Sequence, residues 1–147
     1  MADQKQFCTF YLNKHTFGVK VEQVQEVFRY QEMTKVPLAP REVRGLINLR
    51  GQIITALDLR LRLGMEPMPE GKLPMNVVVR TEDGVVSLLV DEIGDVLQVP
   101  EESYERPPET IPKEVRNLLL GVYKLQGRLL LILDSEKAVN VTGSVPA

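Results

Sequence analysis

One segment of this sequence occurs twice, and the repeat constrains the fold more than any other feature. Residues 45–58 align without a gap with residues 121–134, so that glycines, leucines and a closing aspartate fall on matching positions. Each copy has two apolar runs separated by a polar residue and a glycine, which is the pattern of a β-hairpin. Each copy ends in an aspartate before a short helical pattern, so Asp58 and Asp134 are expected to be N-caps. Because Gly-turn hairpins resemble one another in many β-proteins, this match alone leaves a chance similarity open.

A second pair of segments supports a duplication of the whole unit. Residues 19–28 line up with residues 88–97, and both place acidic residues between apolar ones after an apolar run. Upstream, Phe10 falls on Val79 at the same offset, so each half begins with two alternating strands. We therefore predict a duplicated unit of about seventy residues. The Pro-containing stretch 65–74 is expected to connect the two halves.

Short strands, frequent Gly and Pro turns and only brief helices are typical of an all-β barrel architecture. With the duplication, this predicts two barrels: the first mainly over residues 6–64 and the second mainly over residues 75–140, with an exchange of strands possible. We expect the two barrels to share a third apolar layer, so that residues 1–147 form one domain. Two Pro-rich stretches, 37–40 and 101–113, are expected to be a connector and an exposed loop.

The amino-acid composition argues against several kinds of binding partner. With 18 basic and 20 acidic residues, the net charge is −2, and the chain has no Trp for base stacking, so no nucleic-acid partner is expected. A single cysteine excludes an internal disulfide and a Cys-rich zinc site, and we expect no metal and no cofactor. No apolar run approaches the roughly 20 residues of a membrane helix, and the N-terminus lacks the apolar core of a signal peptide. These features predict a cytoplasmic protein without direct membrane insertion.

The sequence lacks the usual motifs of an enzyme. It has no G-x-G-x-x-G segment, no Walker loop and no G-x-S-x-G segment. Asp58 and Asp134 could form a catalytic pair, but helix capping explains each of them without further assumptions. We therefore predict a protein that binds other proteins and is not an enzyme. The alternative is a ligand-sensing domain or a small barrel enzyme with a pocket between the halves, and an SH3-like nucleic-acid binder is disfavoured by the charge.

Three segments carry a resemblance to a known family: Val24-Gln-Glu-Val27, Val43-Arg-Gly-Leu-Ile-Asn-Leu-Arg-Gly51 and Asp58-Leu-Arg60. They resemble the signature of the CheW family, and the likeness spans about residues 6–140. Proteins of this family are non-catalytic adaptors of bacterial chemotaxis, which couple transmembrane chemoreceptors to the histidine kinase CheA and support its activation. The family's fold is two intertwined five-stranded SH3-like β-barrels, in agreement with the duplication. The likeness also covers a regulatory domain of the kinase and the front half of CheV proteins, but a length of 147 residues favours a stand-alone adaptor recruited to receptor arrays.

The resemblance implies a groove that holds the helical signalling tip of a receptor. Apolar positions of this groove match Val21, Val24 and Val27, which would bury part of the receptor helix. A charged pair on the same surface matches Glu26 and Arg50. The simpler alternatives are that Val21 and Val24 are plain core residues and that Arg50 is a solvated turn cation.

The resemblance also implies structural glycines and a second protein-binding surface. Gly45 and Gly51 match glycines of the hairpin beside the groove. In this family the regulatory domain of CheA binds to the exposed faces and ends of the barrels. The segment around Val85, Leu88 and Val99 is our candidate for one of these contacts.

Overall fold

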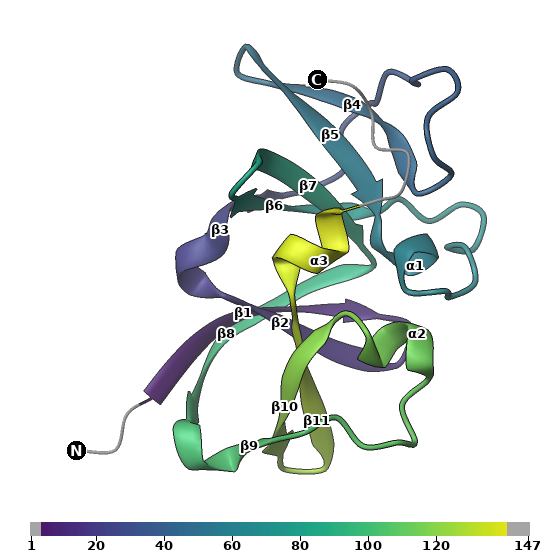
Figure 1. The fold of residues 1–147 in the computed structure, drawn as a ribbon. Coiled ribbons are helices and arrows are strands. Elements are labelled where there is room, and N and C mark those ends of the chain that lie inside the picture. Colours follow the sequence, from purple (N-terminus) through teal and green to yellow (C-terminus); the bar gives the residue numbers. More distant parts are fainter. Residues whose placement is uncertain (1–3, 141–147) are drawn as a thin grey trace.

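The computed structural model describes residues 4–140, which form two β-sheets joined by short helices (Figure 1). The strand order is β8-β1-β2-β11-β10-β9 in the six-stranded sheet and β3-β6-β7-β5-β4 in the five-stranded sheet. The elements are β1 (Gln4–Leu12), β2 (His15–Lys20), the 3-10 helix η1 (Val21–Gln23), β3 (Val24–Phe28), β4 (Val43–Leu49), β5 (Gln52–Asp58), α1 (Leu59–Arg62), β6 (Met75–Thr81), β7 (Gly84–Val90), β8 (Glu92–Pro100), the 3-10 helix η2 (Glu101–Ser103), β9 (Tyr104–Glu105), α2 (Lys113–Arg116), β10 (Leu119–Leu125), β11 (Arg128–Leu133) and α3 (Ser135–Val139).

The two copies of the repeated segment form the same structure. Both are antiparallel hairpins, β4–β5 and β10–β11. In the first hairpin the register shifts between Val43 and Gly45, and in the second it shifts between Leu119 and Gly121, which are the matching positions of the repeat. A β-bulge is a specific local feature of a strand pair, so its recurrence at matched residues confirms the internal duplication.

The helices that follow the two hairpins are capped alike. The Asp58 side chain accepts a hydrogen bond of 3.2 Å from the amide of Leu61, and the Asp134 side chain accepts one of 3.2 Å from the amide of Lys137. Each carboxylate thereby satisfies an amide that has no partner within its own helix. Both aspartates are therefore N-caps, as the sequence predicts.

Each sheet combines strands from both halves of the chain. The hairpin β1–β2, from the first half, lies between β8 and β11. The hairpin β6–β7, from the second half, lies between β3 and β5. The ranges 6–64 and 75–140 therefore each give their opening hairpin to the sheet of the other half, an exchange of strands that the sequence alone leaves possible. The reason is partly geometric: β2 pairs with β11 and β5 pairs with β7 in parallel, and a parallel neighbour cannot follow through a tight turn.

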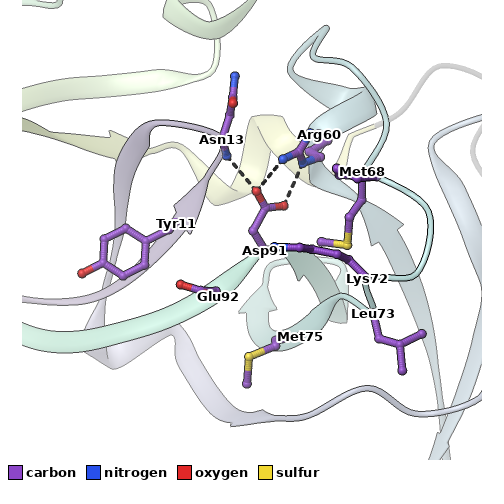
Figure 2. Close-up of a pocket in the computed structure, with 10 residues that line it drawn as sticks. Tyr11, Asn13, Arg60, Met68, Lys72, Leu73, Met75, Asp91 and Glu92 are labelled. Carbon is purple, nitrogen blue, oxygen red and sulfur yellow. Dashed lines mark hydrogen bonds and ion pairs between the residues drawn. The ribbon is translucent and has the colours of Figure 1, made fainter.

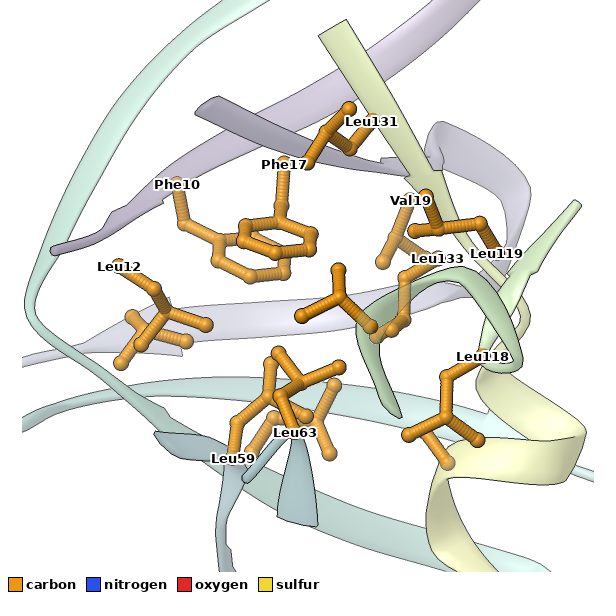
Figure 3. Packing of buried hydrophobic residues seen from close by; sticks show 14 of the residues in the cluster. Phe10, Leu12, Phe17, Val19, Leu59, Leu63, Leu118, Leu119, Leu131 and Leu133 are labelled. Atoms are coloured by element: carbon orange, nitrogen blue, oxygen red, sulfur yellow. The ribbon is translucent and has the colours of Figure 1, made fainter. Parts of the chain in front are cut away.

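A shared apolar layer lies between the two sheets. In its centre, the rings of Phe10 and Phe17 stack with their centroids 5.8 Å apart, as Figure 3 shows. Leu59 of α1 and Ala138 of α3 are fully buried in the same layer, and α3 lies between the sheets in Figure 1. The prediction of a third apolar layer is confirmed. Its buried members are Phe10, Leu12, Phe17, Val19, Leu57, Leu59, Leu63, Val77, Val79, Leu88, Val90, Ile111, Val115, Leu118, Leu119, Val122, Leu131, Leu133 and Ala138.

The Pro-rich stretch 101–113 is more ordered than its composition predicts. It begins with η2, continues into the two-residue strand β9 and ends at the first residue of α2. Tyr104 of β9 pairs with Tyr123 of β10, and its hydroxyl donates a hydrogen bond to the carbonyl of Leu120. Its ring occupies the space in which Gly121 would otherwise carry a Cβ. A short edge strand needs few backbone hydrogen bonds, so it can form next to prolines.

Candidate functional site

The turn between β4 and β5 presents a cation to solvent. Arg50 and Gly51 have φ values of 51° and 86°, and positive φ at both central residues is the mark of a type I′ turn. The side-chain oxygen of Asn48 accepts a hydrogen bond of 2.9 Å from the amide of Gly51. This bond fixes the turn, and the side chain of Arg50 remains 69% exposed.

Arg50 forms an ion pair with Glu26, and the pair joins two edges of one sheet. Glu26 lies on β3 and Arg50 follows β4, which are the two edge strands of the five-stranded sheet. The sheet therefore curls until its edges meet. Beneath the pair lies a small apolar cluster that fills the curled sheet, made of Leu49, Ile54 and Val78 with Phe28 and Val85 packed against it. The structure thus brings together the two charged residues that the resemblance implied.

Val24 and Val27 share one face of β3 although they are three residues apart. Val24 pairs with Val79 and Val27 pairs with Val77, and residues two apart on β6 point to the same side. The register shift between Val24 and Glu26 supplies the extra residue, so a β-bulge places the two valines on the same face. Only Val21 lies in a helix, the short η1.

The burial of these valines separates their roles. Val24 is half-buried and packs against the shared apolar layer, so it contributes to the core as well as to the surface. Val21 is half-buried, and Val27 is 42% exposed. Val27 is therefore the member of this set with the most apolar surface available to a partner.

Gly45 lies in the bulge of β4 and not in the turn. A Cβ at this position would be 2.6 Å from the carbonyl oxygen of Thr34, a backbone atom that cannot move away easily. Thr34 and Leu46 exchange two backbone hydrogen bonds of 2.8 and 2.9 Å, which hold the loop before β4 against the strand. Gly45 is needed for this close approach.

A half-buried ion pair that sequence reasoning missed ties three segments together (Figure 2). Arg60 of α1 binds both carboxylate oxygens of Asp91, with N–O distances of 2.6 and 2.7 Å. Asp91 also accepts a hydrogen bond of 2.8 Å from the backbone amide of Asn13. The two side chains are only 11% and 18% exposed. The pair lies in a cavity of about 540 Å³ whose other lining residues include Tyr11, Met68, Lys72 and Met75.

The charges of this pair stabilise each other. Burial disfavours the charged form of Asp91, but the hydrogen bonds from Arg60 and Asn13, with the positive charge of Arg60, outweigh burial and lower the pKa of Asp91 below its ordinary value. The hydrogen bond to Asp91 raises the pKa of Arg60. The only available sequence signal was Arg60 in the Asp-Leu-Arg segment, because periodicity does not connect residues 31 positions apart.

Among residues 4–140, no three or more His, Cys, Asp or Glu side chains are placed to hold a metal ion. No helix among these residues has the length and apolar character needed to cross a bilayer.

Comparison with known proteins identifies the family. The family described as "CheW-like domain" matches residues 6–142, which is nearly the whole chain. The chain belongs to the CheW-like family. The resemblance carried by Val24–Val27, Val43–Gly51 and Asp58–Arg60 is thereby confirmed.

Relatives and a solved structure support this membership over the full length of the CheW-like domain. The chemotaxis protein CheW of Bacillus subtilis is 30% identical over 138 residues, which cover 94% of this chain and 88% of the relative. The chemotaxis protein CheW of Thermotoga maritima is 30% identical over 131 residues, covering 89% and 85%. The crystal structure of the scaffolding protein TtCheW from Thermoanaerobacter tengcongensis matches with a TM-score of 0.84 and 29% identity, covering 98% of this chain and 97% of that one. The predicted fold, with two SH3-like subdomains, is confirmed.

Two of the three candidate kinase-contact residues of this CheW-like chain are inside the protein. Leu88 is 0% exposed because β7 is a central strand, and Val99 is 3% exposed because it faces the cluster around Phe7. Neither side chain reaches a partner, so both assignments are corrected. Val85 is half-buried, and its contact with the kinase stays a prediction. On β8, the strand that also carries Val99, Val96 is 56% exposed, which apolar patterning alone did not reveal.

Proposed function

We propose that this CheW-like chain is a non-catalytic adaptor of bacterial chemotaxis. It couples the cytoplasmic signalling tips of transmembrane chemoreceptors to the regulatory domain of the histidine kinase CheA and supports activation of the kinase. In this proposal the protein is cytoplasmic and is recruited to receptor arrays at the membrane. The relatives described above support the role, since they are named chemotaxis proteins and one solved structure is named a scaffolding protein.

The observation that carries the proposal is the Glu26–Arg50 pair at the edge strand β3, whose other face carries Val24 and Val27. Arg50 is held in a fixed turn, is 69% exposed and is oriented by Glu26, so its guanidinium is ready to meet a partner. Val24 and Val27 provide apolar surface on the same strand as Glu26. Apolar burial with a charged rim is the mode in which a groove binds a helix. The receptor-binding surface proposed here therefore consists of Val21, Val24, Glu26, Val27 and Arg50.

Binding measurements with two separate fragments test the adaptor role. The purified protein is titrated by calorimetry with a receptor signalling-tip fragment, with the kinase regulatory domain, and with each fragment after saturation by the other. An adaptor binds both, and saturation with one leaves binding of the other intact, because the surfaces differ. Several such contacts of modest affinity add up in an array, so individual dissociation constants in the micromolar range suffice. Binding of neither fragment overturns the proposal.

A further inference from the structure

The loop before β4 carries a leucine that protrudes completely into solvent. Leu38 is 104% exposed, more than any other large apolar side chain among residues 4–140, and it lies between Pro37 and Ala39. Single exposed apolar residues are common on protein surfaces and need no explanation by themselves. Leu38 differs from them in its backbone conformation.

Leu38 has a φ of 62°, in the left-handed region that leucine rarely adopts. Within residues 4–140, the other non-glycine residues with positive φ are Asn13, whose side chain tolerates this conformation, and Arg50, which belongs to the proposed receptor surface. Glycine or asparagine would fit position 38 with less strain. A strained residue that buries nothing within its own chain points to a role outside the chain.

The loop is anchored on both sides of Leu38. Before Leu38, the backbone of Thr34 is hydrogen-bonded to the backbone of Leu46. After it, the amide of Val43 donates a hydrogen bond of 2.9 Å to the carbonyl of Pro40. Pro37 and Pro40 restrict the backbone between these anchors. The side chain of Leu38 is therefore presented by a pre-organised loop, which lowers the entropic cost of binding.

The charges around Leu38 have one sign. Lys35 and Arg41 lie three residues before and after it, both are exposed, and neither forms an ion pair within the described part of the chain. No acidic residue occurs between them. The complement of this docking loop, residues 35–41, is an apolar pocket with carboxylates on its rim.

The docking loop is remote from the proposed receptor surface. It precedes β4, whereas Arg50 follows β4, and Figure 1 shows the loop on the opposite side of this strand from the β4–β5 turn. At about 3.4 Å per residue, a strand of this length separates the docking loop from the β4–β5 turn by roughly 20 Å. One protein can therefore use both at the same time.

We propose that Leu38 inserts into an apolar, acid-rimmed pocket of the kinase regulatory domain, with Lys35 and Arg41 on the rim. This inference rests on the proposed adaptor function. A protruding side chain needs a concave acceptor, which a globular domain can offer. The receptor tip, in contrast, is the convex partner that enters a groove on this protein. The docking loop is thus the second protein-binding surface.

The substitution Leu38→Asn separates this role from a structural one. Asparagine accepts the left-handed conformation, so the melting temperature is expected to rise or stay the same. Affinity for the kinase regulatory domain, measured by calorimetry, is expected to fall at least tenfold, while affinity for the receptor fragment is unchanged. Leu38→Met keeps an apolar side chain of similar size at this position, so this variant is expected to keep most of the affinity. Leu73→Asn is the matched control, because Leu73 is also exposed, at 63%, but lies in the segment before β6.

The charges on the rim provide a second measurement. The double variant Lys35→Glu/Arg41→Glu is expected to slow association with the kinase domain and to reverse the salt dependence of the rate. Unchanged affinity of Leu38→Asn for a kinase domain that the wild-type protein binds overturns this inference and leaves the adaptor function standing. Loss of receptor binding instead of kinase binding also overturns it. Failure of the wild-type protein to bind either fragment overturns the adaptor function, and this inference with it.

Discussion

Glu26 and Arg50 belong to opposite edges of one five-stranded sheet, yet their side chains form an ion pair. The pair marks the line along which the sheet closes on itself, above the cluster of Leu49, Ile54 and Val78. Closure hides part of two edge strands that could otherwise pair with other chains. It also holds the guanidinium of Arg50 at a defined place on the surface, where the proposed receptor contact lies.

The substitution Arg50→Glu is expected to weaken binding of the receptor fragment about tenfold with little loss of stability. Arg50 is 69% exposed, and an exposed ion pair contributes at most about 1 kcal/mol to folding. Calorimetric titration and chemical denaturation measure the two effects separately. Arg106→Glu makes the same change of charge at an exposed position in the Pro-rich loop and serves as the control. Unchanged affinity of Arg50→Glu for the receptor fragment would remove the turn from the site.

Gly45 and Gly51 are expected to respond differently to alanine. At Gly45 a new Cβ meets the Thr34 carbonyl at 2.6 Å, so the loop and the strand must separate, at a cost of about 2–3 kcal/mol. At Gly51 nothing lies within 4 Å, and only the positive φ of 86° disfavours alanine, by about 1 kcal/mol. Urea denaturation of both variants gives the two values. Equal costs would show that the contact with Thr34 relaxes freely.

Local patterns predicted the parts of this fold that depend on neighbours in the sequence. The β4–β5 and β10–β11 hairpins and the caps Asp58 and Asp134 follow from turn and cap chemistry within a few residues. The exchange of opening hairpins could not be predicted in the same way, because β2 and β11 come from opposite ends of the chain. The burial of Leu88 could not be predicted either, because the sequence does not show that β7 is a central strand of its sheet. An apolar strand has the same sequence pattern whether one or both of its faces are covered, and its position in the sheet decides between these two cases.

The candidate site was predicted to a different extent. The Glu26–Arg50 pair came from the family resemblance, and the structure shows the contact, whereas its role in receptor binding stays a prediction. The Arg60–Asp91 pair carries no periodic signal, since its members come from α1 and from the link between β7 and β8. Leu38 was expected to belong to a connector. Only its φ and its exposure, which are properties of the folded backbone, distinguish it.

The two helix caps are expected to differ in strength although they occupy matching positions. Asp58 is 6% exposed and also accepts a hydrogen bond of 3.1 Å from the guanidinium of Arg44. Asp134 is half-buried and accepts a hydrogen bond from the amide of Lys137. Replacing a cap by alanine costs about 1 kcal/mol, and the buried cap should reach about 2 kcal/mol. Thermal and urea denaturation of Asp58→Ala and Asp134→Ala test this order. Asp58→Asn keeps the cap and removes the charge, so it isolates the contribution of Arg44, and a larger loss for Asp134→Ala would contradict the expectation.

The substitution Asp91→Asn is expected to lower the free energy of unfolding by roughly 2–3 kcal/mol at neutral pH, because Arg60 loses a charged partner while it is only 11% exposed. The effect depends on pH in a defined direction. The pKa of Asp91 is lower in the folded protein than the value of about 3.9 for an unfolded chain, so near that pH the unfolded state binds more protons. The stabilisation by Asp91 is therefore complete above the unfolded value and is lost as the pH falls through the folded value.

Urea denaturation of the wild-type and Asp91→Asn proteins at several pH values measures this loss as the difference between their free energies of unfolding. Other carboxylates titrate in both proteins, so the difference isolates Asp91. It should be constant above about pH 5 and shrink below about pH 4. In Arg60→Lys the two-point contact is lost while the charge remains, so Asp91→Asn made in that background should show a smaller difference and a weaker dependence on pH. A difference that stays constant down to about pH 3 would mean that the pKa of Asp91 is the same in the folded and unfolded states. In that case, Arg60 and Asn13 would not hold the carboxylate as tightly as their distances of 2.6–2.8 Å indicate.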